Sequence, residues 1–304
     1  MPAGAPIGLL LGLGAALMWG LTDVAASRAG QRIGSLRVLA TSQLSGTLGL
    51  VVLALAMGES IPTDPQSIAW GILVGLGGAA AYLSFFTALR IGPLSVVSPI
   101  SAAYGGLTVI LAVFLRGESL TVTQAVGSAL ATGGVVLAAL VFDGGLRGVR
   151  IVGRGVGFAM IALVMFAVMT IGSAEAIEVA GWLPLILLAR ITQVTVGWSL
   201  LAVGLRRRPR WMAPMLEAPD STSPRRRAIG IAVLAGLLDA AGLVSFAIGL
   251  DVAETWLVGL ASSFGPAVAV LVAVAVLGER LRATQWIGLA GIALGLAAIA
   301  LAGR

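Results

Sequence analysis

Two residue types are missing from this sequence, and their absence excludes several kinds of chemistry. Cysteine and histidine do not occur among the 304 residues. The chain therefore cannot form disulfides, thiolate nucleophiles, histidine metal sites or histidine proton relays. A carboxylate would have to carry any proton that the protein moves.

Charged residues are scarce as well. Only 11% of the residues are charged and 59% are apolar, against about 25% and 45–50% in an ordinary soluble domain. This composition is typical of a protein whose main solvent is lipid. No segment is left to form a separate soluble domain.

Long uncharged runs divide the chain. About 20 helical residues span a hydrocarbon core of roughly 30 Å. Lipid cannot satisfy free backbone polar groups, and the short alternating segments of barrel strands are absent, so the runs are predicted to be helices. The sequence predicts an all-α membrane protein with ten transmembrane helices, near residues 6–26, 35–57, 67–89, 93–115, 120–141, 151–173, 182–205, 229–250, 253–277 and 283–302.

The net charge of +6 comes from arginine alone, because the chain has no lysine. Most of the arginines lie in every second connection, as in cytoplasmic loops, and the other connections are acidic or mixed. This pattern indicates a multi-pass protein of the inner (cytoplasmic) membrane with both termini on the outer side. It does not favour nucleic-acid binding. The first apolar run is too long for a signal peptide and is expected to stay in place.

A repeated motif divides the chain into two halves. GESLTVTQAVG at 117–127 returns as GERLRATQWIG at 278–288. Five predicted crossings separate the copies, so they face opposite sides, as in inverted repeats of secondary transporters. We expect a first repeat at 1–142 and a second at 150–304. The basic loop at 206–227 is expected to be a flexible surface segment near anionic headgroups.

The glutamate of each copy stands directly before a predicted helix. Glu118 and Glu279 are expected to help satisfy free N–H groups at the start of the 120–141 and 283–302 helices. Gating or ion coupling is the alternative. Outside this motif, Arg37 near the start of one helix is matched with Arg190 inside another.

On these residues the sequence resembles the EamA-type transporters of the drug/metabolite transporter superfamily. The resemblance rests on ALMWGLTDVAASRA, on the two matched arginines and on the two GE blocks, each followed by Thr-Gln-x-x-Gly. It implies a ten-helix fold with a central cavity, the 120–141 and 283–302 helices at the periphery, and export of metabolites, amino acids or drugs. Two departures make the halves unequal: FAVMTIGSAEA replaces the expected Trp-Gly, and Asp239 has Gly78 as its counterpart.

Asp239 and Arg190 are the two charges deep in the second half. A charge at a helix centre costs about 2.5–3.5 kcal/mol on insertion scales, so it is expected to face a cavity or a partner. Asp239 is a candidate for substrate binding or proton coupling, or for a fixed ion pair with Arg190. Arg190 could itself bind a substrate carboxylate or be structural.

The remaining pathway candidates are polar or aromatic side chains on the presumed cavity helices. Asp23 is a second proton-coupling candidate, four residues from Trp19 on one helix face, although a surface pairing with Arg28 or Arg32 is the alternative. Packing or lipid contact is the alternative role for each aromatic residue. The aromatic candidates for the substrate pathway are Trp19, Tyr82, Tyr104, Phe246 and Trp256.

Small residues and prolines are predicted to shape the helices. The glycines of GILVG at 71–75 and GIALG at 291–295 allow close helix approach, and a dimer face at the second is one option. Pro99 and Pro266 are expected to interrupt helices near the pathway, where freed carbonyls can meet protein or water.

The sequence thus predicts a secondary transporter, an exporter of small metabolites or amphipathic drugs that works by alternating access. Proton coupling and facilitated uniport both remain open. No Walker A motif is present, and no cofactor or metal is expected. A membrane-embedded enzyme and a channel are the competing classes. The expected partners are a small-molecule substrate, the lipid bilayer and protons, in a monomer or homodimer.

Overall fold

The computed structural model describes residues 4–91, 97, 100–101, 103–139, 154–216, 225–268, 271–272 and 283–301. Every regular element in these ranges is helical. In chain order the elements are α1 (Ala5–Ile33), α2 (Ser35–Met57), α3 (Pro65–Ile91), α5 (Tyr104–Arg116), α6 (Val122–Ala139), α7 (Arg154–Ala180), α8 (Trp182–Arg207), the 3-10 turn η2 (Arg210–Met212), α9 (Ala213–Leu216), α10 (Arg225–Val252), α11 (Thr255–Ser262) and α13 (Ala283–Leu301).

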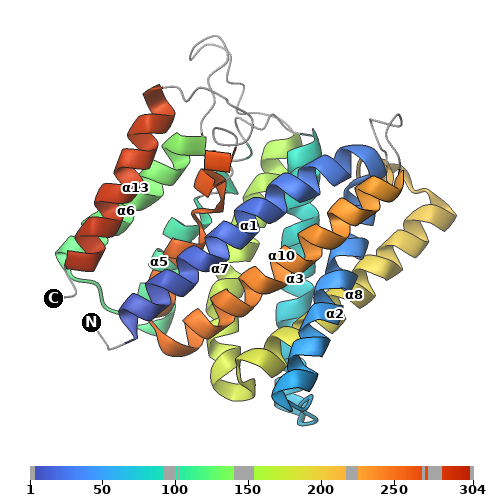
Figure 1. Cartoon of the computed structure of the whole chain (residues 1–304), viewed down its shortest axis with the longest axis horizontal. Helices are drawn as coiled ribbons and strands as arrows, with labels where there is room; N and C mark the ends of the chain where they lie inside the picture. The colour runs from blue at the N-terminus through green and yellow to red at the C-terminus, as the bar shows by residue number, and fades with distance from the viewer. Residues whose placement is uncertain are drawn as a thin grey trace.

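Six of the described helices are long and apolar enough to cross a membrane, namely α1, α2, α3, α7, α8 and α10. Four shorter apolar helices lie in the other predicted runs. This agrees with the predicted all-α membrane class. Figure 1 shows the long helices packed side by side, with α6 and α13 as a pair at one edge of the molecule.

The packing of the helices is symmetric between the two halves. α1 packs along α10, and α3 packs along α7. α2 contacts α10 while α8 contacts α3, and the pairs α2–α8, α5–α11 and α6–α13 each join one helix of the first half to one of the second. Exchanging the halves leaves this set of pairs unchanged. The two halves are therefore interleaved along their whole length.

A glycine turn of the same geometry begins the second helix of each half. Gly34 between α1 and α2 has φ 83° and ψ 149°, and Gly181 between α7 and α8 has φ 78° and ψ 156°. A positive φ with extended ψ is open to glycine and strained for other residues. The two turns give a residue-by-residue register between α1–α2 and α7–α8.

The predicted close approach at the glycine pairs is confirmed. A Cβ atom added at Gly134 of α6 would lie 2.6 Å from the carbonyl oxygen of Gly288 on α13, and one at Gly295 would lie 2.5 Å from that of Gly127. The glycine face of α13 is thus covered by α6 of the same chain. Gly71 of α3 packs as closely against Leu188 of α8.

The predicted helix at 253–277 is interrupted. α11 ends at Ser262, a turn follows at 263–264, and helix resumes at 265–268. In the first half α5 begins at Tyr104, directly after a turn residue, Ala103, whose N–H donates to Ile100 O at 3.2 Å. The interruption precedes Pro266, as predicted for that proline, whereas Pro99 lies outside the described residues.

The basic loop contains a docked segment, which corrects the expectation of a flexible loop throughout. Met212 and Met215 are buried against the α1–α2 turn. Arg37 Nη1 donates to Leu216 O at 3.1 Å and to Ile33 O at 2.9 Å. Two apolar side chains and an arginine bridge therefore hold residues 210–216 in place, while residues 217–224 lie outside the described ranges.

Asp64 directly precedes α3, which begins at Pro65. Its Oδ1 accepts the N–H of Ser67 at 2.8 Å. A capping carboxylate followed by proline is a common helix start. The backbone hydrogen bond from Ser67 lowers the pKa of Asp64 below its usual value.

Candidate functional site

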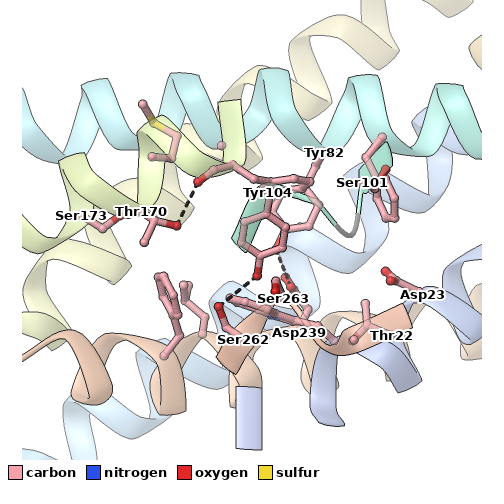
Figure 2. Close-up of a pocket in the computed structure, with 18 of the residues that line it drawn as sticks. Thr22, Asp23, Tyr82, Ser101, Tyr104, Thr170, Ser173, Asp239, Ser262 and Ser263 are labelled. Atoms are coloured by element: carbon pink, nitrogen blue, oxygen red, sulfur yellow. Dashed lines mark hydrogen bonds between the residues drawn. The ribbon is translucent and has the colours of Figure 1, made fainter. Parts of the chain in front are cut away.

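A cavity of about 140 Å³ lies between the two halves. Its wall comes from α1, α3 and α5 of the first half and from α7, α8, α10 and α11 of the second. The helix interruptions open onto it, because Ser101, Tyr104, Ser262 and Ser263 all line it. Figure 2 shows Tyr82 and Tyr104 at the centre of the view, with Asp23 to one side and Thr170 and Ser173 to the other.

Two carboxylates line the cavity, and they have different surroundings. Asp239 of α10 is 2% exposed, and one of its oxygens lies 2.5 Å from Arg190 Nη2. Its other oxygen accepts a hydrogen bond from the Tyr82 hydroxyl at 2.7 Å. Asp23 of α1 is half-buried and makes no hydrogen bond or ion pair with any residue that the structure describes. One carboxylate is neutralised by an arginine and the other is not.

Arg190 lies behind the cavity wall rather than in it. It is 1% exposed and pairs with Asp239, and its Nη1 donates to Gln43 Oε1 on α2. The fixed ion pair offered as its alternative role is present. The guanidinium therefore connects α2 of the first half to α10 of the second through α8.

When Gly34 is aligned with Gly181, the residue that corresponds to Arg190 is Gln43. The sequence pattern had matched Arg190 with Arg37 instead. Gln43 stands nine residues after Gly34, and Arg190 stands nine residues after Gly181. Arg37, which was matched with Arg190, instead holds the docked segment described above. Gln43 and Arg190 therefore occupy corresponding positions and form a hydrogen bond with each other between the two halves. The match of Arg37 with Arg190 did not predict this contact.

The same register pairs the residues of α1 with those of α7. Trp19 and Phe166 each stand fifteen residues before the turn glycine, and Asp23 and Thr170 each stand eleven before it. All four line the cavity. The first helix of each half thus contributes the same two positions, with an acid in one half and a neutral hydroxyl in the other.

Aromatic rings cover much of the wall. Tyr82 and Tyr104 both contact Phe166, with ring centroids 5.5 and 5.7 Å apart. Trp19 and Phe246 lie 5.2 Å apart on the α1–α10 pair. Such separations are favourable for ring pairs. Both carboxylates belong to the α1–α10 wall, which gives the cavity an acidic side.

An ion cluster lies at one end of the bundle, where α5 and α7 end and α11 begins. Arg116 contacts Glu118 at 3.3 Å and Glu178 at 2.6 Å, and it also pairs with Glu175. Glu118 accepts the N–H groups of Thr255 and Trp256 at 3.0 and 2.9 Å. Glu118 therefore caps α11 of the other half, which corrects its expected place at the start of the 120–141 helix. Glu279 lies outside the described residues.

The predicted pathway residues fall into two groups. Trp19, Asp23, Tyr82, Tyr104, Asp239 and Phe246 line the cavity. Arg190 lies behind it, and Trp256 is fully buried in the apolar core, where its indole N–H donates to Glu254 at 3.0 Å.

Sequence reasoning missed several lining residues. Phe166 and Thr170 could have been found by placing the two turn glycines in register. Gln193, one turn after Arg190, lines the cavity and is a polar residue inside an apolar run. Ser262 and Ser263 gave no local signal, because their role depends on the helix ending there.

Comparisons with known proteins place the chain in a family. The EamA-like transporter family matches residues 6–140 and 211–301, one match in each half. A solved structure described only as a crystal structure of a protein shares the fold, with a TM-score of 0.76 and 20% identity over 97% of this chain and 96% of that one. None of the curated proteins compared matches. The chain therefore belongs to the EamA-like transporter family and is a multi-pass membrane transporter of the drug/metabolite transporter superfamily.

Proposed function

We propose that the protein is a secondary exporter that moves a small solute by alternating access through the cavity between its halves. Ten membrane crossings in two inverted repeats would place this cavity near the middle of the bilayer, with both termini on the outer side of the inner membrane. The observation that carries the proposal is that both halves line one cavity and pack against each other in symmetric pairs. Rocking one half against the other would expose the cavity to each side in turn.

Proton coupling is part of the proposal, and the two lining carboxylates are its candidates. Asp23 is the stronger one, because it has no partner among the described residues. Its charged and titratable neighbours around the cavity are Asp239 of α10, Arg190 of α8, Tyr82 of α3 and Tyr104 of α5. Asp239 is the weaker candidate, because Arg190 and the Tyr82 hydroxyl already hold its two oxygens.

Counterflow in liposomes tests this function. Purified protein is reconstituted, the vesicles are loaded with unlabelled solute, and uptake of labelled solute is followed with and without a pH gradient. We expect saturable exchange that a pH gradient accelerates in the wild type, and no acceleration in Asp23→Asn. Exchange that ignores the gradient in every variant would favour facilitated uniport and would end the coupling proposal.

The direction of transport needs a separate measurement. Cells that produce the protein should accumulate less of the solute than cells that produce an inactive variant. Greater accumulation would identify an importer and contradict the export proposal.

A further inference from the structure

We propose that the cavity accepts a singly charged aromatic amine of about one ring, with Asp23 as its counter-charge. This substrate class rests on the transport function proposed above. The charge balance, the hydrogen-bonding groups, the aromatic wall and the size of the cavity each point to such a ligand.

The charge balance favours a cation. Within the described residues the wall of the cavity contains two carboxylates and no arginine or lysine. Arg190 neutralises Asp239 from behind, which leaves the charge of Asp23 uncompensated. An unpaired carboxylate in the wall of a cavity attracts a cation and repels a second anion. A substrate with a single positive charge would balance the site.

Two oxygens in the wall that lack a partner can accept N–H donors, whereas the indole N–H of Trp19, also without a partner among the described residues, can only donate. Gln193 Oε1 and Ser101 Oγ are enclosed and make no hydrogen bond with any described residue. Both side chains are more than nine-tenths buried and line the cavity. An ammonium group has donors and no acceptor, so it suits a carboxylate together with an amide oxygen and a hydroxyl. A buried acceptor without a partner is unfavourable, and a bound ammonium would relieve this.

The aromatic wall favours a ring next to the charge. Tyr82, Tyr104 and Phe166 form a continuous set of ring contacts on the α3, α5 and α7 side, and the Tyr82 hydroxyl reaches Asp239 on the acidic α1–α10 side. Aromatic faces attract cations as well as other rings. A ligand with an ammonium group at one end and a ring at the other matches both sides.

The size of the cavity limits the ligand to about one ring. An apolar cavity of about 150 Å³ in another protein accepts benzene, and this one measures about 140 Å³. A single ring is comparable in size with that space, and large polycyclic dyes exceed it.

Binding to the purified protein tests the substrate class. The probe is 2-phenylethylammonium, titrated into wild type, Asp23→Asn and the control Asp251→Asn, whose side chain is exposed at the end of α10. We expect Asp23→Asn to weaken binding about 10- to 100-fold, the loss for a charge-assisted hydrogen bond. Asp251→Asn should bind like the wild type. Equal binding by wild type and Asp23→Asn would overturn the proposal.

The probe itself provides a second test that needs no variant. On the wild type, 2-cyclohexylethylammonium keeps the charge but replaces the aromatic ring with a saturated one. It should bind roughly 3- to 10-fold more weakly. Phenylacetate keeps the ring and reverses the charge, and it should not compete. Competition by phenylacetate as strong as that by the amine would overturn the assignment even if Asp23→Asn does not fold.

A flux measurement separates this proposal from the transport function. 2-Phenylethylammonium, at a pH where nearly all of it is charged, should show saturable counterflow in liposomes above its non-saturable leak into protein-free vesicles. If leucine exchanges and this cation does not, the substrate class is wrong and the transport function stands. If neither probe nor any solute of a wider panel exchanges, the transport function itself is contradicted.

Discussion

Asp239 and Arg190 form an ion pair between two buried charged side chains. Both are almost fully buried, and each also meets a polar side chain of the first half: Tyr82 for Asp239 and Gln43 for Arg190. Two charges in a water-poor interior are tolerated when they pair with good geometry. Removing one of them leaves the other without compensation. The pair therefore joins the halves at their centre.

The first prediction concerns this pair. Asp239→Ala should destabilise the purified protein by about 3–5 kcal/mol, since it leaves Arg190 buried and unpaired. The double variant Asp239→Leu with Arg190→Leu should recover most of that loss, because no charge remains. Thermal unfolding in detergent measures both. The matched control is Asp251→Asn on the same helix, where the exposed side chain predicts a change within about 0.5 kcal/mol. A single variant as stable as the control would show that the pair is dispensable.

At the scale of the elements, two glycine positions on one helix offer a test of close packing. Gly134 of α6 faces backbone atoms of α13, whereas neighbouring Gly133 has no atom within 4 Å of an added Cβ. Small residues of this kind let two helices approach closely in lipid. The α6–α13 pair depends on this approach.

The second prediction follows from this difference. Gly134→Ala should lower stability by about 1–3 kcal/mol, because its methyl group would lie 2.6 Å from the Gly288 carbonyl oxygen and the Ile292 nitrogen and the helices would have to separate. Gly133→Ala should be neutral or slightly stabilising, as alanine is the better helix former. Unfolding midpoints of the two variants, measured side by side, check this. Equal midpoints would contradict the packing role of Gly134.

At the scale of the whole molecule, the Arg116 cluster ties three helices together at the end of the bundle where α1 begins. That end also contains the α10–α11 connection, since a Cβ added at Gly8 would lie 2.2 Å from the Cβ of Ala253. Arg116 connects α5 to α7 through Glu175 and Glu178, and to α11 through Glu118. An exporter that works by alternating access would have to open this end. The cluster would then favour the closed arrangement.

The third prediction uses the natural absence of cysteine as a clean background. Ser173 of α7 lines the cavity, so Ser173→Cys is labelled only as fast as a reagent reaches it. Adding Arg116→Gln should raise the labelling rate by an impermeant maleimide about fivefold, if the cluster stabilises the closed form by about 1 kcal/mol. Arg207→Gln, at the exposed end of α8, is the control and should leave the rate unchanged. An unchanged rate in Arg116→Gln would remove the cluster from the gating of the cavity.

Composition, uncharged runs and the internal repeat were sufficient to predict an all-α membrane protein with two related halves. Composition and uncharged runs average over many residues, so a single misjudged position changes them little. The repeat of eleven residues is read directly from the sequence and does not depend on packing. These signals were enough to predict helices, two halves and six of the residues that line the cavity. They were also enough to single out Asp23 and Asp239.

Most of the contacts between polar groups became apparent only in the folded arrangement of the helices. Glu118 caps a helix of the other half, Arg190 meets its own counterpart Gln43, and Asp23 is left without a partner among the described residues. The first two contacts join segments more than a hundred residues apart, which spacing along the chain does not encode. The charge of one carboxylate is cancelled and that of the other is not because the fold brings a single arginine to Asp239.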